Sequence, residues 1–128
     1  MSTAAAGPRL VAIDAGTTGA RAALFDLDGH LLAEARRSYP TASPQVGWSE
    51  QEGDAWRSAA LGALRDLIAG SGTGSSIRAI GLTGQCPSIV LVDERGRPTG
   101  PGLIYRDNRA SAEAAAIRAR LLPQTTMI

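Results

Sequence analysis

Short apolar runs separated by turn-forming residues dominate the first part of the chain. Residues 10–13 and 21–25 are rich in alanine and branched side chains, which predicts two strands. Residues 26–29 have the sequence DLDG, which is typical of a turn, and residues 30–37 predict a third strand that becomes polar at its end. Because the connections are short, we expect these strands to form an antiparallel meander.

A helical period replaces this pattern further along the chain. Ser49 and Glu52 have the spacing of a capping box, and Trp48 is placed to pack on the helix as a hydrophobic staple. Apolar residues then recur on one helical face, namely Trp56, Ala60, Leu64, Leu67 and Ile68. Residues 70–76, which are rich in glycine and serine, end the helix. Residues 77–82 predict a strand, which we expect to return parallel to the sheet.

The last part of the chain predicts a hairpin and a helix. Apolar residues 88–92 and residues 102–105 flank the turn sequence DERGRP, so we expect these two runs to pair. Residues 109–122 are rich in alanine and predict a helix, which Pro123 ends and Asp107 or Asn108 would cap. The sequence therefore predicts an α/β domain with a mixed sheet, preceded by a loose tail over residues 1–8.

Composition narrows the class of protein. The chain has 128 residues, a formal net charge of +1 and few aromatic residues, so we expect an aliphatic core and no nucleic-acid binding driven by bulk charge. Every basic residue is arginine, which excludes a Walker-type phosphate loop because that loop needs a lysine. One cysteine excludes an internal disulfide. With no signal-like or membrane-length apolar run, a cytoplasmic protein is expected.

The turn after the first strand carries residue types that suit a phosphate. Glycines at positive φ would let backbone N–H groups approach an anion, and threonines add hydroxyl donors. A carboxylate beside a polyphosphate needs a cation between them, which favours Mg²⁺. The residues concerned are Asp14, Gly16, Thr17, Thr18, Gly19 and Arg21. Taken alone, their spacing slightly favours a plain hairpin turn.

Two later turns suit a ligand that is rich in hydroxyl groups. Gln85 can both donate and accept, although a tight turn with Gln85 in solvent is the simpler interpretation. Cys86 follows it, but nothing places the single histidine, His30, near enough to activate a thiol. Tyr105 stands beside Asp107, Asn108 and Arg109, which could bind a sugar; alternatively Tyr105 belongs to the core.

Three motifs occur in an order that resembles the N-terminal part of the FGGY family of carbohydrate kinases, xylulokinase-like members most of all. They are IDAGTTGARAALFD, GWSEQEGDAW and IRAIGLTGQCPSIVLVDERGRPTGPGLIYRDNRA, and together they cover about residues 9–120. The resemblance implies the ribonuclease H-like, actin-like ATPase fold, in which ATP and Mg²⁺ bind in a cleft between two domains.

The resemblance also implies roles for individual residues. Asp14 would lie near the metal ion, directly or through water, and Gly16, Thr17, Thr18 and Arg21 would face the phosphates. Gln85 and Cys86 would lie on the turn that contacts the sugar, although xylulokinases have Gln-Met-His-Gly where this chain has Gln-Cys-Pro-Ser. Tyr105 replaces a tryptophan that often lies against the sugar, and Asp107 and Arg109 match the W-x-D-x-R pattern.

The implied activity is ATP-dependent phosphorylation of a hydroxyl of a sugar or polyol, with a ketopentose such as xylulose as the substrate. Family members are several times longer and carry the catalytic aspartate beyond position 128. We therefore expect residues 9–128 to be a partial N-terminal domain, inactive alone, with open apolar surface that favours homo-oligomers. The alternatives are an actin- or Hsp70-like nucleotide-binding module without sugar kinase activity, and a globular fragment without a ligand.

Overall fold

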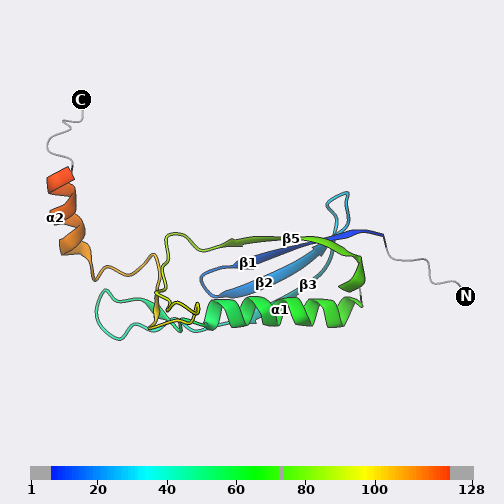
Figure 1. The fold of residues 1–128 in the computed structure, drawn as a ribbon, viewed down its shortest axis with the longest axis horizontal. Coiled ribbons are helices and arrows are strands. Elements are labelled where there is room, and N and C mark those ends of the chain that lie inside the picture. Colours follow the sequence, from blue (N-terminus) through cyan, green and yellow to red (C-terminus); the bar gives the residue numbers. More distant parts are fainter. Residues whose placement is uncertain (1–6, 73, 122–128) are drawn as a thin grey trace, which may run out of the picture.

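The computed structural model describes residues 7–72 and 74–121. In Figure 1 a four-stranded sheet lies along one helix, and a second helix stands apart at the far end of the molecule. The elements are β1 Arg9–Ala15, β2 Gly19–Phe25, β3 Leu31–Ser38, β4 Glu50–Gln51, α1 Ala55–Ser71, a 3₁₀ turn Gly74–Ser76, β5 Ile77–Gly84, β6 Gly102–Leu103 and α2 Ser111–Leu121.

The sheet has the order β3-β2-β1-β5. Strands β1, β2 and β3 are antiparallel neighbours, and β5 pairs with β1 in parallel. The predicted meander and the predicted parallel strand are therefore confirmed. Because β1 and β5 run in the same direction, both end at the edge where the β1–β2 turn lies.

Helix α1 packs across β2 and β3 and also touches β1. The core cluster between them is aliphatic, as the composition predicts, and consists of Val11, Ile13, Ala22, Leu24, Ala63 and Leu67. Ala22 and Ala63 have no exposed surface, so small side chains let the helix approach the sheet closely. Strand β5 is different, because Ile80 and Leu82 remain 48% and 77% exposed. Open apolar surface is thus present, as expected.

The start of α1 differs from its prediction. The helix begins at Ala55 behind Asp54, and Ser49 lies in a buried position before strand β4. The backbone N–H of Ser49 donates to the Asp107 carboxylate at 2.7 Å, so Ser49 belongs to a contact with a distant segment. The prediction that Ser49 and Glu52 form a capping box was therefore wrong. Trp48 stacks on Arg109 and is no staple for the helix.

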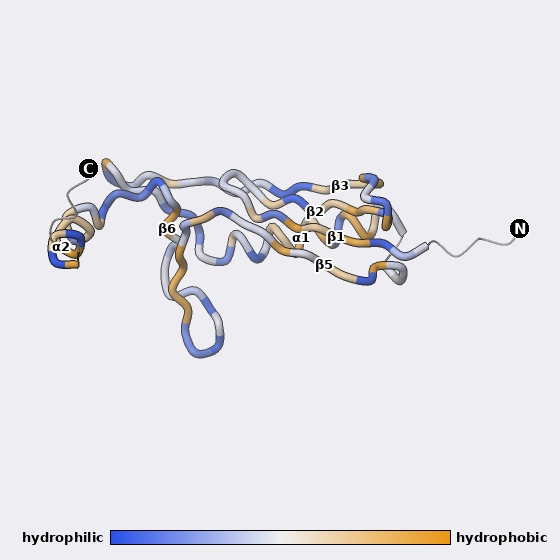
Figure 2. Tube along the Cα trace, turned by 90° about the horizontal axis from the view of Figure 1, so that it is seen from above, coloured by the Kyte–Doolittle hydropathy of each residue, from blue (hydrophilic) through white to orange (hydrophobic). Residues whose placement is uncertain are grey.

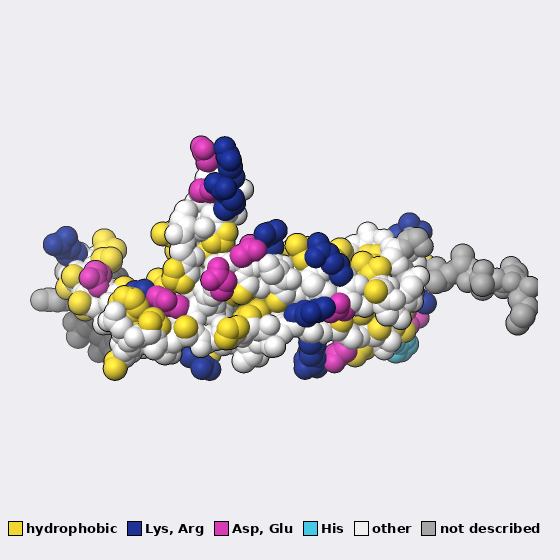
Figure 3. All heavy atoms as spheres, turned by 90° about the horizontal axis from the view of Figure 1, so that it is seen from below, with side chains coloured by type: hydrophobic (Ala, Val, Ile, Leu, Met, Phe, Trp, Pro, Cys, Tyr) yellow, Lys and Arg dark blue, Asp and Glu magenta, His cyan; other side chains and the backbone are white. Residues whose placement is uncertain are grey.

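The predicted hairpin is confirmed, because Ile89 pairs with Leu103 and Val92 pairs with Pro98 in antiparallel bridges, the first of which joins the two expected runs. Strand β6 pairs mainly with β4, which joins residues 50–51 to residues 102–103. The arm formed by residues 89–103 extends from the body with an apolar stem and a hydrophilic tip (Figure 2). Figure 3 shows that acidic and basic side chains crowd together at this tip.

Helix α2 confirms the second helical prediction over Ser111–Leu121, while Pro123 lies outside the described residues. The Asp107 carboxylate bonds to Ser49 and Arg109, ahead of the first helical residue, so it does not act as the expected N-cap. None of the helices in residues 7–72 and 74–121 has the length and apolar character that crossing a membrane requires.

Candidate functional site

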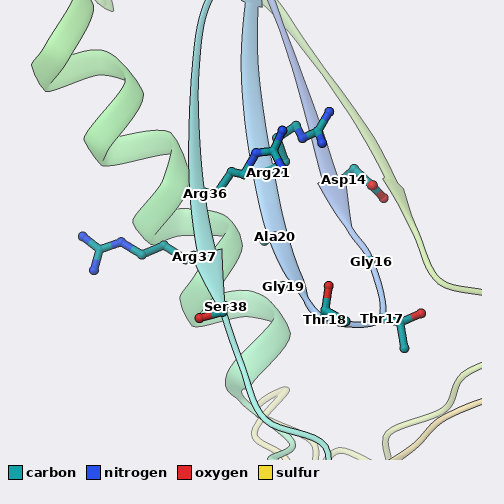
Figure 4. Close-up of a pocket in the computed structure, with 10 residues that line it drawn as sticks. All are labelled: Asp14, Gly16, Thr17, Thr18, Gly19, Ala20, Arg21, Arg36, Arg37 and Ser38. Carbon is teal, nitrogen blue, oxygen red and sulfur yellow. The ribbon is translucent and has the colours of Figure 1, made fainter.

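The β1–β2 turn is a tight hairpin with Thr17 and Thr18 at its tip (Figure 4). The Gly16 N–H donates to the Gly19 carbonyl at 3.0 Å. Neither glycine has a positive φ, so that part of the prediction was wrong. Gly19 is needed for another reason, because a Cβ there would lie 2.5 Å from the Arg37 carbonyl oxygen on β3.

The carbonyl groups at the hairpin tip are all bonded inside the protein. The Tyr39 hydroxyl donates to the Gly16 carbonyl, and the Tyr39 N–H donates to the Thr18 carbonyl at 3.2 Å. The Gln51 side chain donates to the Thr17 carbonyl at 2.7 Å. By contrast, no described residue accepts a hydrogen bond from the N–H of Thr17 or Thr18. The tip therefore keeps donors available, which is the polarity that an anion needs.

An open pocket of about 450 Å³ lies against this hairpin, lined by Asp14, Thr17, Thr18, Arg21 and Arg36 among others. Figure 4 shows the Arg21 and Arg36 side chains side by side on one face of the sheet, with Arg37 pointing the opposite way. Arg37 instead pairs with Asp66 of α1 at 2.6 Å.

The two arginines in the pocket share one counter-ion. Arg21 and Arg36 are direct neighbours across β2 and β3. Glu34 lies 2.9 Å from Arg36 and 3.9 Å from Arg21. Like charges directly opposite each other on a sheet repel, and a single carboxylate offsets only part of this. A second anion in the pocket would offset the remaining repulsion between Arg21 and Arg36.

Asp14 stands at the end of β1, exposed, with Arg21 and Thr83 as its neighbours across the sheet. None of the described residues donates a hydrogen bond or forms an ion pair to its carboxylate. A single free carboxylate fits a Mg²⁺ ion held mostly by phosphate oxygens and water, since Mg²⁺ in proteins commonly has only one or two carboxylate ligands. The residues present therefore fit the expected metal ion.

A second group of metal-ligating residues lies at the opposite end of the sheet. Asp26, Asp28 and His30 bring their ligand atoms within 4.8 Å of one another in the β2–β3 turn. The backbone N–H of His30 donates to Asp26 and lowers the pKa of that carboxyl. These contacts stabilise the β2–β3 turn. His30 is also remote from Cys86 at the other end of the sheet, as the sequence indicated.

Gln51 is the most buried polar residue near the hairpin, with 2% of its surface exposed. Its Nε2 donates to the Thr17 carbonyl at 2.7 Å and to the Thr41 hydroxyl at 2.8 Å. Its Oε1 accepts from the Trp56 indole at 2.5 Å and from Gln85 Nε2 at 2.8 Å. We call Gln51 and these four partners the Gln51 network.

Gln85 is part of this network and does not point into solvent, so the simpler interpretation of its turn was wrong. Its backbone N–H donates to the Ala15 carbonyl at 3.0 Å, which continues the β1–β5 pairing up to the hairpin. Its Oε1 is closed off from solvent and accepts no hydrogen bond from the described residues. The next residue, Cys86, is exposed.

Asp107 and Arg109 form a second polar cluster beside this network. Arg109 donates to Asp107 at 2.7 and 2.8 Å and to Glu50 at 2.6 Å. The guanidinium lies 3.7 Å from the centre of the Trp48 ring, a cation–π contact. Hydrogen bonds from Arg109 hold the pKa of the Asp107 carboxyl well below its usual range, and Asp107 in turn raises the pKa of Arg109.

Tyr105 is 45% exposed and therefore not a core residue. Its hydroxyl accepts from Arg106 Nε at 3.0 Å, and this contact, followed by one with Thr17, lowers the pKa of Tyr105. Tyr105, Asp107 and Arg109 line a second pocket of about 280 Å³ together with Pro87. Both groups of predicted residues thus meet at the same end of the sheet.

The FGGY family of carbohydrate kinases, N-terminal domain, matches residues 9–127. The chain belongs to this family. Its fold is accordingly α/β, the N-terminal part of the actin-like ATPase fold of FGGY kinases.

Individual relatives agree with this assignment. The chain is 37% identical to the glycerol kinase of Rhodospirillum centenum over 114 residues, which is 88% of this chain and 23% of that kinase. A crystal structure of a xyloylose kinase from Brucella ovis matches with a TM-score of 0.82 and 32% identity, over 88% of this chain and 24% of that one. The xylulose kinase from Rhodospirillum rubrum gives a TM-score of 0.80 and 33% identity, over 89% and 24%.

The chain thus spans less than a quarter of the length of these FGGY kinases. The relatives are named for two different substrates, glycerol and xylulose, so they place the chain among sugar and polyol kinases without selecting one substrate.

Gln51 is the site residue that sequence reasoning missed. It stands in the sequence SEQE, where it looks like a solvated residue ahead of a helix. Its side-chain partners Thr17 and Gln85 are each 34 positions away, so no local pattern marks it. The signal that was available is its place inside one of the three motifs that carry the FGGY resemblance.

Proposed function

We propose that the protein containing this chain transfers the γ-phosphoryl group of ATP to a hydroxyl of a neutral sugar or polyol, a ketopentose such as xylulose being the favoured substrate. The observation that carries the proposal is the hydrogen bond from the Gln85 N–H to the Ala15 carbonyl. It joins the expected sugar turn to the expected phosphate hairpin. A kinase must hold both reactants together, and positioning supplies much of the rate of phosphoryl transfer.

The hairpin would hold the phosphates. The N–H groups of Thr17 and Thr18, which bond to none of the described residues, supply donors at the hairpin tip, and the Thr18 hydroxyl adds another. Arg21 supplies a guanidinium on the same side of the sheet. Asp14 would hold Mg²⁺, directly or through water. When bound, that ion neutralises charge on the phosphate oxygens.

The sugar would bind beside the Gln85 turn. Gln85 and Cys86 lie on this turn, and Tyr105 offers an exposed ring as an apolar wall. Asp107 and Arg109 line the adjoining pocket and fix the segment that carries Tyr105. Their charges are already paired with each other and with Glu50, which suits a neutral ligand better than an acidic one.

The substitution Asp14→Ala tests the proposal in the protein as it is naturally made. We expect the rate of ADP release with ATP, Mg²⁺ and xylulose or glycerol to fall by about 100-fold or more, since charge stabilisation of the transition state would be lost. Asp28→Ala is the matched control, because it removes an exposed carboxylate at the far end of the sheet.

Two results would count against the proposal. If turnover is unaltered in Asp14→Ala, the metal role is wrong. If the wild-type protein is stabilised by nucleotide in a thermal-shift assay and by no member of a sugar panel, the nucleotide-binding module is the better description.

A further inference from the structure

The hydrogen-bonding polarity of the Gln51 amide is fixed by two partners that can act in only one way. The Trp56 indole N–H can only donate, and the Thr17 carbonyl can only accept. Gln51 must therefore turn Oε1 towards Trp56 and Nε2 towards Thr17. The reverse orientation would set donor against donor and acceptor against acceptor inside the protein, where water cannot compensate.

This orientation fixes the amide of Gln85 in turn. Gln85 meets Oε1 of Gln51, so it must present Nε2 to that oxygen at 2.8 Å. A flipped Gln85 would bring two amide oxygens together. The consequence is that Gln85 keeps its own Oε1 on the other side, where none of the described residues donates to it.

A buried acceptor without a donor is uncommon in folded proteins and calls for an explanation. Gln85 Oε1 accepts no hydrogen bond from residues 7–72 or 74–121, while every polar atom of the neighbouring Gln51 amide is satisfied. Gln85 as a residue is only partly buried and the residues that follow, Cys86 and Pro87, are exposed, so Oε1 belongs to a turn at the protein surface. An oxygen acceptor with a fixed orientation suits a ligand hydroxyl group, which can donate a hydrogen bond to it.

We propose that Gln51 is a positioning residue, which orients Gln85 so that its carbonyl oxygen receives a hydrogen bond from a substrate hydroxyl. Through the Thr17 carbonyl, the same Gln51 amide ties this substrate contact to the phosphate hairpin. The inference rests on the proposed function for the identity of the ligand. The orientation of the two amides follows from their hydrogen bonds alone.

Two substitutions at position 51 separate the effect of Gln51 on Gln85 from its effect on the phosphate hairpin. Gln51→Met removes all four hydrogen bonds at nearly constant volume, so we expect the KM for the sugar and the KM for ATP each to rise about tenfold. Gln51→Glu still accepts from Trp56 and Gln85 but cannot donate to Thr17. We expect it to raise the KM for ATP more than the KM for the sugar. Gln45→Met is the matched control on an exposed loop and should change neither.

A spectroscopic measurement tests the positioning without relying on turnover. The chain has two tryptophans, and only the Trp56 indole donates to Gln51. In ¹⁵N-labelled wild-type protein we expect its indole N–H signal to move on addition of xylulose or glycerol, with Trp48 as the internal reference. In Gln51→Met the Trp56 signal should start at a different position and should no longer respond.

The outcomes distinguish the two proposals. A wild-type protein that phosphorylates no sugar or polyol refutes the proposed function, while a wild-type Trp56 signal that still moves on addition of xylulose or glycerol supports the positioning role without relying on turnover. Wild-type KM values in Gln51→Met overturn the positioning role even if the kinase activity is present. If Gln51→Met does not fold, two other measurements decide. An unchanged KM for ATP in Gln51→Glu overturns the link to the hairpin, and a wild-type Trp56 signal that does not move at saturating sugar overturns the link to the substrate.

Discussion

The core between α1 and the sheet and the junction formed by residues 39–56 and 85–110 bury different kinds of side chain. The core cluster contains only aliphatic residues. In the junction, the buried residues include Ser49 and Gln51, and the contacts are hydrogen bonds and ion pairs between segments far apart in the chain. The core holds the sheet together, and the junction joins the hairpin to the two expected sugar motifs.

This difference has a physical reason. Apolar burial has no direction, so the core tolerates small shifts as long as its volume is filled. A hydrogen-bonded network fixes orientation as well as distance, and a buried amide is costly if one partner is lost. The polar residues of the proposed site therefore gain precision from the junction, while the core buries the apolar side chains that drive folding.

Gly19 lies where the two regions meet, and its substitution should have the largest effect. In Gly19→Val the new Cβ would lie 2.5 Å from the Arg37 carbonyl oxygen and 2.9 Å from the Ser38 Cα, both of which are backbone atoms that cannot turn aside. We expect β2 and β3 to separate and the free energy of unfolding to fall by about 4 kcal/mol or more, measured by chemical denaturation.

Gly16→Ala is the control for that change, because a Cβ at position 16 meets nothing closer than 3.6 Å. A Gly19→Val protein as stable as Gly16→Ala would show that the close approach of β2 and β3 is not what the glycine serves.

Replacing a leucine in the core should lower the free energy of unfolding much more than replacing a leucine on β5. Leu24 is 2% exposed and belongs to the core cluster, so Leu24→Ala should cost about 3 kcal/mol of unfolding free energy through lost burial and a cavity. Leu82 is 77% exposed, so Leu82→Ala should change stability by less than about 0.5 kcal/mol. Equal losses in the two variants would contradict the described limits of the core.

Asp107→Asn should have a smaller effect, confined to the junction and dependent on pH. Hydrogen bonds from Arg109 lower the pKa of Asp107 in the folded protein, so its stabilising effect is present above the unfolded pKa of about 4 and is lost as the pH falls below it. We expect Asp107→Asn to lower the melting temperature at pH 7 by about 3 °C.

Melting curves collected from pH 7 to pH 3 check the direction of this pH dependence. The gap between wild type and Asp107→Asn should stay constant down to about pH 5 and narrow below about pH 4. A gap that widens as the pH falls would mean that the Asp107 carboxylate does not stabilise the folded state.

The sequence predicted the strands and the helix that build the core because their signals are local, although Leu67 is the only residue of the predicted helical face that is fully buried, beside Ala59 and Ala63. The short apolar runs and turn residues of residues 10–37 and the helical period after residue 55 depend on neighbours a few positions apart, and both patterns give the observed elements. The junction does not have this property. Ser49 and Glu52 match a capping box locally, but the Ser49 N–H donates to Asp107, 58 positions later, and the helix begins only at Ala55.

The candidate site residues were predicted from motifs rather than from geometry, and the physical reasons given for them changed once the contacts were known. Gly19 was expected to supply a positive φ, yet it serves the close approach of two strands. Gln85 was expected in solvent on local grounds, yet it is held by Gln51. Residues whose partners lie on other segments cannot be assigned a role from spacing alone.

Both tryptophans of the chain, Trp48 and Trp56, belong to the junction, and the aliphatic core cluster contains none. Trp48 lies under the Arg109 guanidinium and Trp56 donates to Gln51. Intrinsic fluorescence of this protein therefore reports on the junction and on the first turn of α1, where Trp56 packs beside Ala20, Tyr39 and Ala59, while circular dichroism reports on the whole length of α1. A fluorescence change that precedes the loss of helical signal during heating would mark local opening of the functional end while the sheet and α1 stay folded.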